Sequence, residues 1–445
     1  MKICVVNGSP RGKYSVTIHT SLYIEKKWGA DDEFNYLNVG QGIKGHEKNF
    51  ARATEALTNA DLIVFSYPVY TFLVPYQLHR FFELIKENKV DLTGKMVTQI
   101  CTSKHFYDVT AHNFVKENCF DLGMNYIKGL SADMDDLTRV KGQQEVDSFW
   151  SFVKYSAENK VFEQPIPRVA SAICESQAEI VEVQKVDSKK RTIIITNIVE
   201  GDTKLRTMID DYKKAYKYPT VELNIANLPL IGGCLGCFGC TGTAQCVYKD
   251  GFQEFYLKEV LGADAIVYAF TIKDHSMGAT FKRYDDRQFF NGHRTMSMGV
   301  PVAYVINGDY YAEHNLRTVV EARAEVGHNY MAGVIIDNNS MLSTVAKVEY
   351  AMEKGVNIPP NFYGVGGMKI FRDLIYIMRG MMSADHKFYK AHGFYDDLPQ
   401  KQKTRMIMML LVGRMYSNPK IKAKMGSKLN EGIVMPYKKV LDSIK

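Results

Sequence analysis

Short, continuously apolar runs alternate along the chain with longer stretches in which apolar residues recur at helical spacing. The runs ICVV, LIVFS and VTQIC lie in the first part of the chain, and IIIT, AIVYAF and VAYVI lie in a later part. Such runs are typical of parallel strands that are covered on both faces. Because helical stretches separate them, the pattern predicts βαβ units and an α/β fold with doubly wound parallel sheets.

The same order of runs occurs twice. GMNYIKGLSADM, from Gly123, aligns with GHNYMAGVIIDN, from Gly327, at an offset of 204. NADLIVFSYPVY, ending at Tyr70, aligns with GADAIVYAFTIK, ending at Lys273, at an offset of 203. The opening strands KICVVNG and RTIIITN align at 190, so the second copy has 13 additional residues before its AIVYAF strand. We predict two tandem α/β domains, each with a doubly wound parallel sheet, the alternative being two unrelated α/β domains with chance similarity.

These patterns divide the chain into four parts. We expect a first domain over 1–160, a connector over 161–189, a second domain over 190–365 and a basic helical tail over 366–445. The tail has 16 Lys and Arg against 6 Asp and Glu, whereas the whole chain has a net charge of +7. A nucleic-acid enzyme places its positive charge on the body that reads the ligand, so nucleic acid is not an expected partner.

The tail permits two interpretations. Its helices either pack on the domains or on a partner subunit, or they bind peripherally to an anionic membrane, which basic amphipathic helices suit. The apolar segment Met406–Gly413 is shorter than the roughly 20 residues that span a bilayer. Because the N-terminus MKICVVNGSPRG has no secretory pattern, we expect a cytoplasmic location, with peripheral contact at the inner face of the membrane left open.

The turn in VVNGSPRGKYSVT joins a buried strand to a helix. Gly8, Ser9, Ser15 and Thr17 offer backbone N–H groups and hydroxyls at the helix N-terminus, where the helix dipole favours an anion, and Arg11 adds positive charge. The spacing is not that of a Walker loop. A tight turn without a ligand is the alternative.

A second motif, SYPVYTF, follows the third strand of the first copy. Tyr67, Pro68, Val69 and Tyr70 would lie at the carboxyl edge of the sheet, where open α/β folds bind ligands. Tyrosine rings offer flat surfaces for an aromatic ligand, and proline provides a rigid backbone. The alternative is a loop whose tyrosines cover the sheet edge.

Four cysteines gather in the interval where the second copy is longer. Cys234, Cys237, Cys240 and Cys246 have the spacing C-x2-C-x2-C-x5-C. Closely spaced cysteines in a chain without an export signal indicate metal or redox chemistry. Four thiolates in one glycine-rich loop can converge on a [4Fe–4S] cluster. Zinc, which usually takes two separated pairs, and thiols without metal are the alternatives.

Taken together, the GSPR turn and the YPVY loop resemble the flavodoxin-like NAD(P)H-dependent FMN reductase family, which implies that the two copies are tandem flavodoxin-like domains. The cysteine spacing resembles that of iron–sulfur flavoproteins, which carry FMN beside a [4Fe–4S] cluster. By this resemblance, the residues that bind the FMN phosphate are Ser9, Arg11, Ser15 and Thr17. Those beside the flavin ring are Pro68, Val69, Tyr70, Thr102 and Ser103.

The second copy has lost both flavin motifs. TNIVEGDTKL replaces the phosphate turn and adds Glu200 and Asp202, which are electrostatically unfavourable beside a phosphate. FTIKDH replaces the YPVY loop. We therefore expect FMN in the first copy and the redox cysteines in the second. If the tandem arrangement mimics a dimer of single domains, the cysteines would lie within electron-transfer distance of the FMN.

The resemblance implies a flavin-dependent oxidoreductase that passes electrons from NADH or NADPH through FMN to a small-molecule or protein acceptor. No side chain is needed as a catalytic acid or base, because the flavin supplies the chemistry. One rival is an electron-transfer module that is reduced by a protein partner. Another is a binding or regulatory protein that has lost its flavin. An oligomer is compatible with either oxidoreductase interpretation.

Several other residues receive simpler interpretations. We expect the loop histidines to be solvated or hydrogen-bonded; these are His275, His293 and His328. We expect the scattered cysteines to be small buried residues; these are Cys4, Cys101, Cys119 and Cys174. We expect three charged residues to lie on a helix surface; these are Asp285, Asp286 and Arg287.

Overall fold

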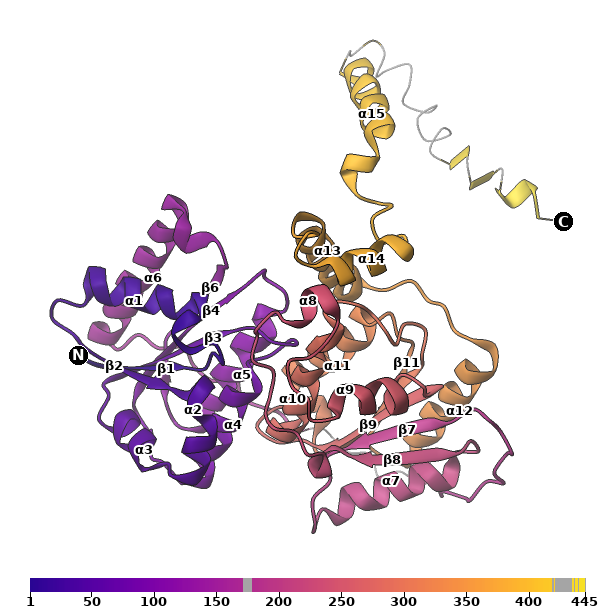
Figure 1. Ribbon diagram of the computed structural model, residues 1–445, viewed down its shortest axis with the longest axis horizontal. Coiled ribbons are helices and arrows are strands. Elements are labelled where there is room, and N and C mark those ends of the chain that lie inside the picture. Colours follow the sequence, from indigo (N-terminus) through magenta and orange to yellow (C-terminus); the bar gives the residue numbers. More distant parts are fainter. Residues whose placement is uncertain (171–177, 418–419, 421–433, 436, 439, 445) are drawn as a thin grey trace. The chain divides into compact units, whose positions relative to one another are not determined.

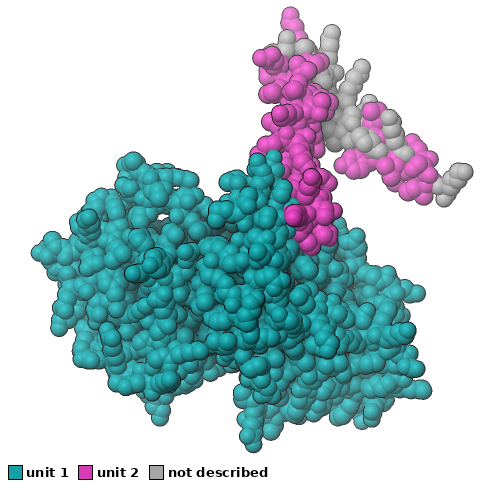
Figure 2. All heavy atoms as spheres, in the orientation of Figure 1, with its two compact units in different colours: residues 1–386 teal, residues 387–445 magenta. Residues whose placement is uncertain are grey.

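The computed structural model describes residues 1–170, 178–417, 420, 434–435, 437–438 and 440–444. The chain divides into two compact units, Met1–His386 and Lys387–Lys445 (Figure 2). Cys174 lies outside the described residues, as do parts of the expected connector and tail. None of the helices in the described part of the chain combines the length and the apolar character that crossing a membrane would require.

The first unit contains two parallel sheets with flanking helices, as the sequence predicts (Figure 1). The first sheet has the order β2-β1-β3-β4-β5, and β6 pairs with β4. Its strands are β1 (Lys2–Asn7), β2 (Glu33–Asn38), β3 (Leu62–Pro68), β4 (Met96–Ser103), β5 (Asn125–Tyr126) and β6 (Leu130–Asp133). The order reverses between β1 and β3, so the carboxyl ends of these strands form the crevice where doubly wound sheets bind ligands.

Helices cover both faces of this sheet. They are α1 (Val16–Trp28), α2 (Val39–Lys48), α3 (Ala51–Thr58), α4 (Tyr76–Glu87), α5 (Asp108–Asp121) and α6 (Val140–Asn159). Alternate side chains of β1 point to opposite faces, yet Cys4 and Val5 are both buried. Burial on both faces of the sheet therefore explains the continuous apolar run, as we expect. Cys101 and Cys119 are also buried, as predicted.

The second sheet has the order β8-β7-β9-β10-β11, which repeats the order of the first. Its strands are β7 (Thr192–Thr196), β8 (Thr220–Asn224), β9 (Ala265–Thr271), β10 (Val302–Asn307) and β11 (Met331–Ile335). Its main helices are α7 (Thr203–Ala215), α10 (Gly278–Arg287), α11 (His314–Val326) and α12 (Asn338–Lys354). Two short helices, α8 (Cys240–Thr243) and α9 (Phe252–Phe255), lie in the interval where the second copy is longer.

The C-terminal region is helical, as predicted. Its helices are α13 (Phe362–Ile377), α14 (Ser383–Ala391) and α15 (Lys403–Tyr416). The first compact unit includes all of α13, which packs against α11.

The loops that follow β3 and β9 have the same backbone form. Tyr70 and Leu73 exchange two backbone hydrogen bonds of 2.8 and 3.0 Å, and Lys273 and Ser276 do the same at 2.9 and 3.0 Å. The two residues inside each hairpin have positive φ; they are Thr71, Phe72, Asp274 and His275. The two hairpins match at the offset of 203 that the sequence repeat has.

Helices α4 and α10 follow these hairpins and pack against each other. The backbone N–H of Ala279 donates to Glu83 Oε1 at 2.8 Å, and that of Tyr76 donates to Asp286 Oδ2 at 2.7 Å. The surface position that we expect for Asp285, Asp286 and Arg287 is wrong, because each is at most 2% exposed. Helix α10 packs against α4 and against the cysteine-rich loop (residues 231–250), and its buried charges are paired: Asp285 with Arg323, Asp286 with Lys282 and Arg287 with Asp250.

Candidate functional site

One cavity of about 460 Å³ lies at the carboxyl edge of the first sheet. This volume is within the usual range of cofactor sites. All nine residues that the sequence assigns to FMN line the cavity, and so do Cys234, Cys237, Cys240 and Cys246. The structure thus brings together two sets of candidates that come from different halves of the chain.

The phosphate turn is formed by short local hydrogen bonds. Ser9 N donates to Asn7 Oδ1 at 3.1 Å, and Gly12 N donates to Ser9 O at 3.0 Å. Helix α1 then begins after Ser15, whose side chain makes no capping hydrogen bond. Ser9 and Ser15 are nevertheless buried. An uncapped helix N-terminus with buried hydroxyls beside it suits an anion.

Arg11 provides positive charge at this turn. Among the described residues no carboxylate lies within ion-pair distance of its guanidinium, which instead lies 5.3 Å from the centre of the Phe238 ring. Deeper in the site, the hydroxyls of Thr17 and Thr102 are 2.5 Å apart, and Ser103 Oγ accepts a hydrogen bond from His105 N. The turn therefore offers hydroxyl groups and one cation that no acidic side chain neutralises.

The loop after β3 forms another wall of the cavity. Pro68, Val69 and Tyr70 are half-buried there, and the Tyr70 ring lies 5.5 Å from the ring of Phe289 in the second half. Burial raises the pKa of Tyr70, so its hydroxyl stays protonated at neutral pH. This wall is therefore aromatic, which suits a ligand with an aromatic ring system.

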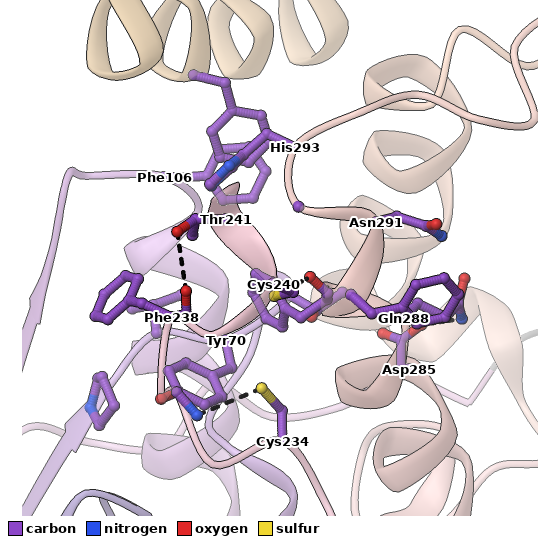
Figure 3. A pocket seen from close by; sticks show the side chains of 18 of the residues that line it. Tyr70, Phe106, Cys234, Phe238, Cys240, Thr241, Asp285, Gln288, Asn291 and His293 are labelled. Atoms are coloured by element: carbon purple, nitrogen blue, oxygen red, sulfur yellow. Dashed lines mark hydrogen bonds between the residues drawn. The ribbon is translucent and has the colours of Figure 1, made fainter. Parts of the chain in front are cut away.

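The cysteine-rich loop, residues 231–250, lies directly against this wall. Figure 3 shows Tyr70 and Cys234 on neighbouring loops. Gly236 has a φ of +60°, and a methyl group there would overlap Tyr70 Oη. Gln77 Nε2, on α4, also donates to Cys234 O at 3.4 Å. The glycine is thus required both by its backbone conformation and by the close approach of the two loops.

Arg287 anchors the cysteine-rich loop to α10. Its guanidinium donates to both carboxylate oxygens of Asp250 at 2.7 Å and to Gly232 O at 3.1 Å. It also lies 4.4 Å from the centre of the Tyr248 ring. Sequence reasoning missed this role, because the spacing of charges in α10 does not show which of them meet a partner distant in sequence.

The four thiols have different surroundings. Burial raises the pKa of Cys234 to about 12 and that of Cys240 to about 11. Cys240 Sγ donates to Phe289 O at 3.2 Å, and Gly236 N donates to Cys234 Sγ at 3.4 Å, whereas Cys237 is exposed. Within the described part of the chain, no three of the four sulfur atoms lie within 4.8 Å of one another. A single zinc ion would hold its sulfur ligands about 3.8 Å apart, given Zn–S bonds of about 2.3 Å.

Helix α13 contributes a wall that the sequence did not indicate. Phe371 stacks on Phe106 of the first half at 4.1 Å and lies 4.4 Å from the ring of His293 in the second half. Asp385 Oδ2 lies 3.1 Å from His293 Nδ1, so this histidine is hydrogen-bonded, as predicted. Leu374 also lines the cavity. The apolar face of this helix is therefore used inside the first unit.

In the second half, the helix that corresponds to α1 is α7, and a carboxylate caps its N-terminus. Asp202 caps α7 by accepting from Leu205 N at 3.2 Å. Its other oxygen accepts from the Thr271 hydroxyl at 2.5 Å, and Asn307 Nδ2 donates to the first at 3.5 Å. The acidic residue that the sequence identifies as unfavourable thus occupies the anion position of this helix itself.

The sequence of residues 1–132 matches a family described as having a flavodoxin-like fold. Solved structures with similarity include an NADH:FMN oxidoreductase (EMOB) in apo form, at 15% identity and a TM-score of 0.29, covering 35% of this chain and 89% of the other. The flavoenzyme NAD(P)H:(acceptor) oxidoreductase FerB from Paracoccus denitrificans matches at 17% identity and a TM-score of 0.28, covering 35% and 97%. An FMN-dependent NADH-azoreductase from Bacillus anthracis, in complex with FMN, matches at 16% identity and a TM-score of 0.25, covering 36% and 99%.

A comparison with curated proteins finds no match. The class that the fold defines is an α/β protein with two flavodoxin-like parallel sheets and a helical C-terminal region.

Proposed function

We propose that the protein is an FMN-dependent oxidoreductase that accepts electrons from NAD(P)H. The observation that carries the proposal is the single cavity that joins the uncapped N-terminus of α1, the cation of Arg11 and an aromatic wall. The turn with Arg11 suits the phosphate of FMN, and the aromatic wall suits its ring system. When bound, FMN would accept a hydride from the nicotinamide and release electrons singly or in pairs.

The residues of this chain would position the cofactor and exclude water. Ser9, Ser15 and Thr17 would donate to the phosphate beside Arg11, and Tyr70 would face the flavin ring. The remaining contacts would come from Pro68, Val69, Thr102 and Ser103. Because the cysteine-rich loop covers the Tyr70 side of the cavity, it would limit the access of solvent to that face.

We also propose a [4Fe–4S] cluster on Cys234, Cys237, Cys240 and Cys246. Support comes from the cavity that the four thiols share with the candidate flavin residues and from their closely spaced positions in one loop. The matching hairpins and strand orders support the tandem duplication that would have placed a flavin site and a cluster site side by side. The cluster would pass electrons between the flavin and an acceptor.

The first experiment is to purify the protein without oxygen and to assay FMN, iron and acid-labile sulfide per chain. The expected result is FMN together with iron and sulfide in equal amounts. Cys237→Ser should lower the iron content and leave FMN in place, whereas Cys4→Ala, which removes a buried thiol in β1, should leave both unchanged. Absence of flavin from the purified protein and from protein incubated with FMN would overturn the proposal.

Addition of NADH or NADPH without oxygen distinguishes an NAD(P)H-dependent oxidoreductase from an electron-transfer module that a protein partner reduces. Bleaching of the flavin absorbance by either nucleotide supports the NAD(P)H-dependent oxidoreductase. A flavin that stays oxidised with both nucleotides, yet is reduced by dithionite, indicates the electron-transfer module that a protein partner reduces.

The tail carries a separate proposal, peripheral contact with an anionic membrane. In α15 the side chains from Met406 to Leu411 are all more than half exposed, and basic residues flank them. Sedimentation with phosphatidylcholine vesicles, with and without phosphatidylserine, tests it. Leu410→Glu with Leu411→Glu should reduce recovery with the anionic vesicles, and Val140→Glu, at an exposed apolar position of α6, should not. Equal recovery of all proteins would contradict the proposal.

A further inference from the structure

A buried histidine without a hydrogen-bond partner lies between the two halves of the first unit. His79 is 0% exposed, and within the described part of the chain neither of its ring nitrogens has a hydrogen-bond partner. Its ring packs against Phe114 at 4.5 Å. Burial lowers the pKa of His79 to about 3, so the imidazole is neutral and keeps a free lone pair. Leaving both nitrogens of a buried imidazole unpaired is costly, so this side chain calls for a ligand.

Two carboxylates lie beside the imidazole. Glu83 follows His79 by one turn of α4, so both project from the same helix face, and Asp274 enters from the hairpin after β9. One ligand atom of each of the three residues lies within 4.8 Å of the other two. Asp274 Oδ2 is buried and also has no hydrogen-bond partner among the described residues. Three potential ligand atoms therefore surround one point at the contact between the halves.

Both carboxylates have other contacts, which leave Asp274 Oδ2 without a hydrogen-bond partner among the described residues. Glu83 accepts from Ala279 N through Oε1 and pairs with Arg80 and Lys273 through Oε2. Asp274 pairs with Lys86 through Oδ1 at 2.7 Å. None of these cations has a hydrogen bond to the imidazole.

The matching place in the other half already contains a cation. At the offset of 203, His79 corresponds to Lys282 and Glu83 corresponds to Asp286. The ammonium group of Lys282 pairs with Asp286, and both side chains are 0% exposed. Lys282 Nζ also donates to Tyr70 O, in the hairpin of the opposite half, at 2.8 Å. Here a built-in cation links a helix of one half to the hairpin of the other.

We propose that His79, Glu83 and Asp274 bind a divalent transition-metal ion, with zinc as the best fit, and that this ion joins the two halves of the first unit. The ion would link α4 of the first half to the hairpin of the second, as the Lys282 ammonium links α10 of the second half to the hairpin of the first. An imidazole with two carboxylates suits zinc better than calcium or magnesium, which prefer oxygen ligands alone. A water molecule would supply the fourth ligand. The nearby His275 carries no such proposal, because both its ring nitrogens have partners, in Glu313 and Asp121.

The test compares bound zinc in the full-length protein and its variants. After removal of metal with a chelator and dialysis against zinc, the wild type should retain about one zinc per chain more than His79→Leu or Asp274→Asn. The four cysteines are unchanged in these variants, so any zinc that they hold cancels in the comparison. His112→Leu, which changes a histidine whose Nε2 contacts Cys101 Sγ, is the matched control and should retain the wild-type amount. Equal zinc in all four proteins would overturn the proposal.

Thermal unfolding gives a second measurement. Zinc should raise the unfolding midpoint of the wild type and of His112→Leu, but not that of His79→Leu, because an ion that binds only the folded state stabilises it. Without metal, His79→Leu should be at least as stable as the wild type, since it removes an unpaired buried polar group. If it is instead less stable than the wild type by the same amount with and without zinc, His79 has only a packing role. Neither measurement depends on flavin, so failure here is distinguishable from failure of the oxidoreductase proposal.

Discussion

At the scale of single residues, the turn before α1 places one cation, Arg11, in the lining of the cavity. Arg11 has no carboxylate partner among the described residues and lies beside the uncapped N-terminus of α1. Its neighbour Lys13 is exposed and lies over the ring of Tyr14 at 5.3 Å. The two residues are therefore similar in charge and close in sequence, but only Arg11 lines the cavity.

Arg11→Gln should weaken FMN binding about 10- to 100-fold, because a charge-assisted hydrogen bond to the phosphate contributes about 1.5–3 kcal/mol. The measurement is a titration of the apoprotein with FMN, in which quenching of flavin fluorescence reports binding. Lys13→Gln is the control and should bind FMN as the wild type does. Equal losses in both variants would show that the turn attracts FMN only through its general charge.

A second prediction at this scale concerns the ion pair of Arg287 with Asp250. Hydrogen bonds from Arg287 are the main reason that the pKa of Asp250 falls to about 2, below its ordinary value of about 3.9. A carboxyl group whose pKa is lower in the folded state stabilises the fold above its unfolded pKa, and this contribution is lost as pH falls toward 2.

Asp250→Asn should thus lower the free energy of unfolding by about 1–2 kcal/mol at pH 7, and by about half as much at pH 3. Urea unfolding of both proteins at several pH values between 7 and 3 measures the difference. A difference that does not change with pH would mean that the Asp250 side chain acts by accepting from the backbone N–H groups of Ile231 and Phe252, and not through its charge.

At the scale of elements, the central feature is the contact of two loops from different halves. The cysteine-rich loop and the hairpin after β3 approach each other at Gly236, where no side chain can be accommodated. Gly251, at the end of the same loop region, has a similar backbone, with a φ of +76°, but has open space around it. Substitutions at these two glycines therefore distinguish the cost of backbone strain from the cost of steric overlap between the loops.

Gly236→Ala should lower both FMN affinity and stability more than Gly251→Ala. Both variants have the cost of a left-handed backbone, about 1 kcal/mol, but only the first displaces Tyr70 from its place in the cavity wall. Urea unfolding and FMN titration measure the two effects. Equal FMN affinity in the two variants would contradict the contact between the loops in solution.

At the scale of the whole molecule, two similar sheets differ in their anion sites. In the first half the N-terminus of α1 is open, whereas in the second half Asp202 caps α7 and is hydrogen-bonded by Thr271 and Asn307. An internal carboxylate already accepts from Leu205 N at this helix end, and its charge repels a second anion.

Saturation of the apoprotein with FMN should therefore give one FMN per chain and not two. The stoichiometry is measured from flavin absorbance after removal of free FMN, against a protein concentration from amino-acid analysis. Two FMN per chain would show that Asp202 moves aside or is not the factor that closes the second site.

Much of the fold and of the candidate cavity could be predicted from the sequence, because these depend on local patterns. Continuous apolar runs such as ICVV indicate buried parallel strands, and the carboxyl ends of such strands meet at one edge. The turn with Ser9 and the loop with Tyr70 each follow a strand directly, so their place at that edge follows from the strand order alone.

The sequence by itself thus determined two parallel sheets, the turn and the loops at their edges, and a longer cysteine-bearing interval in the second half. Only the tertiary structure decided which distant residues meet: Arg287 with Asp250, Phe371 with Phe106, and His79 with Asp274. Periodicity shows that a side of a helix is apolar or charged, but not what packs against it. For that reason the charged residues of α10 look like surface residues in the sequence and are buried in the molecule.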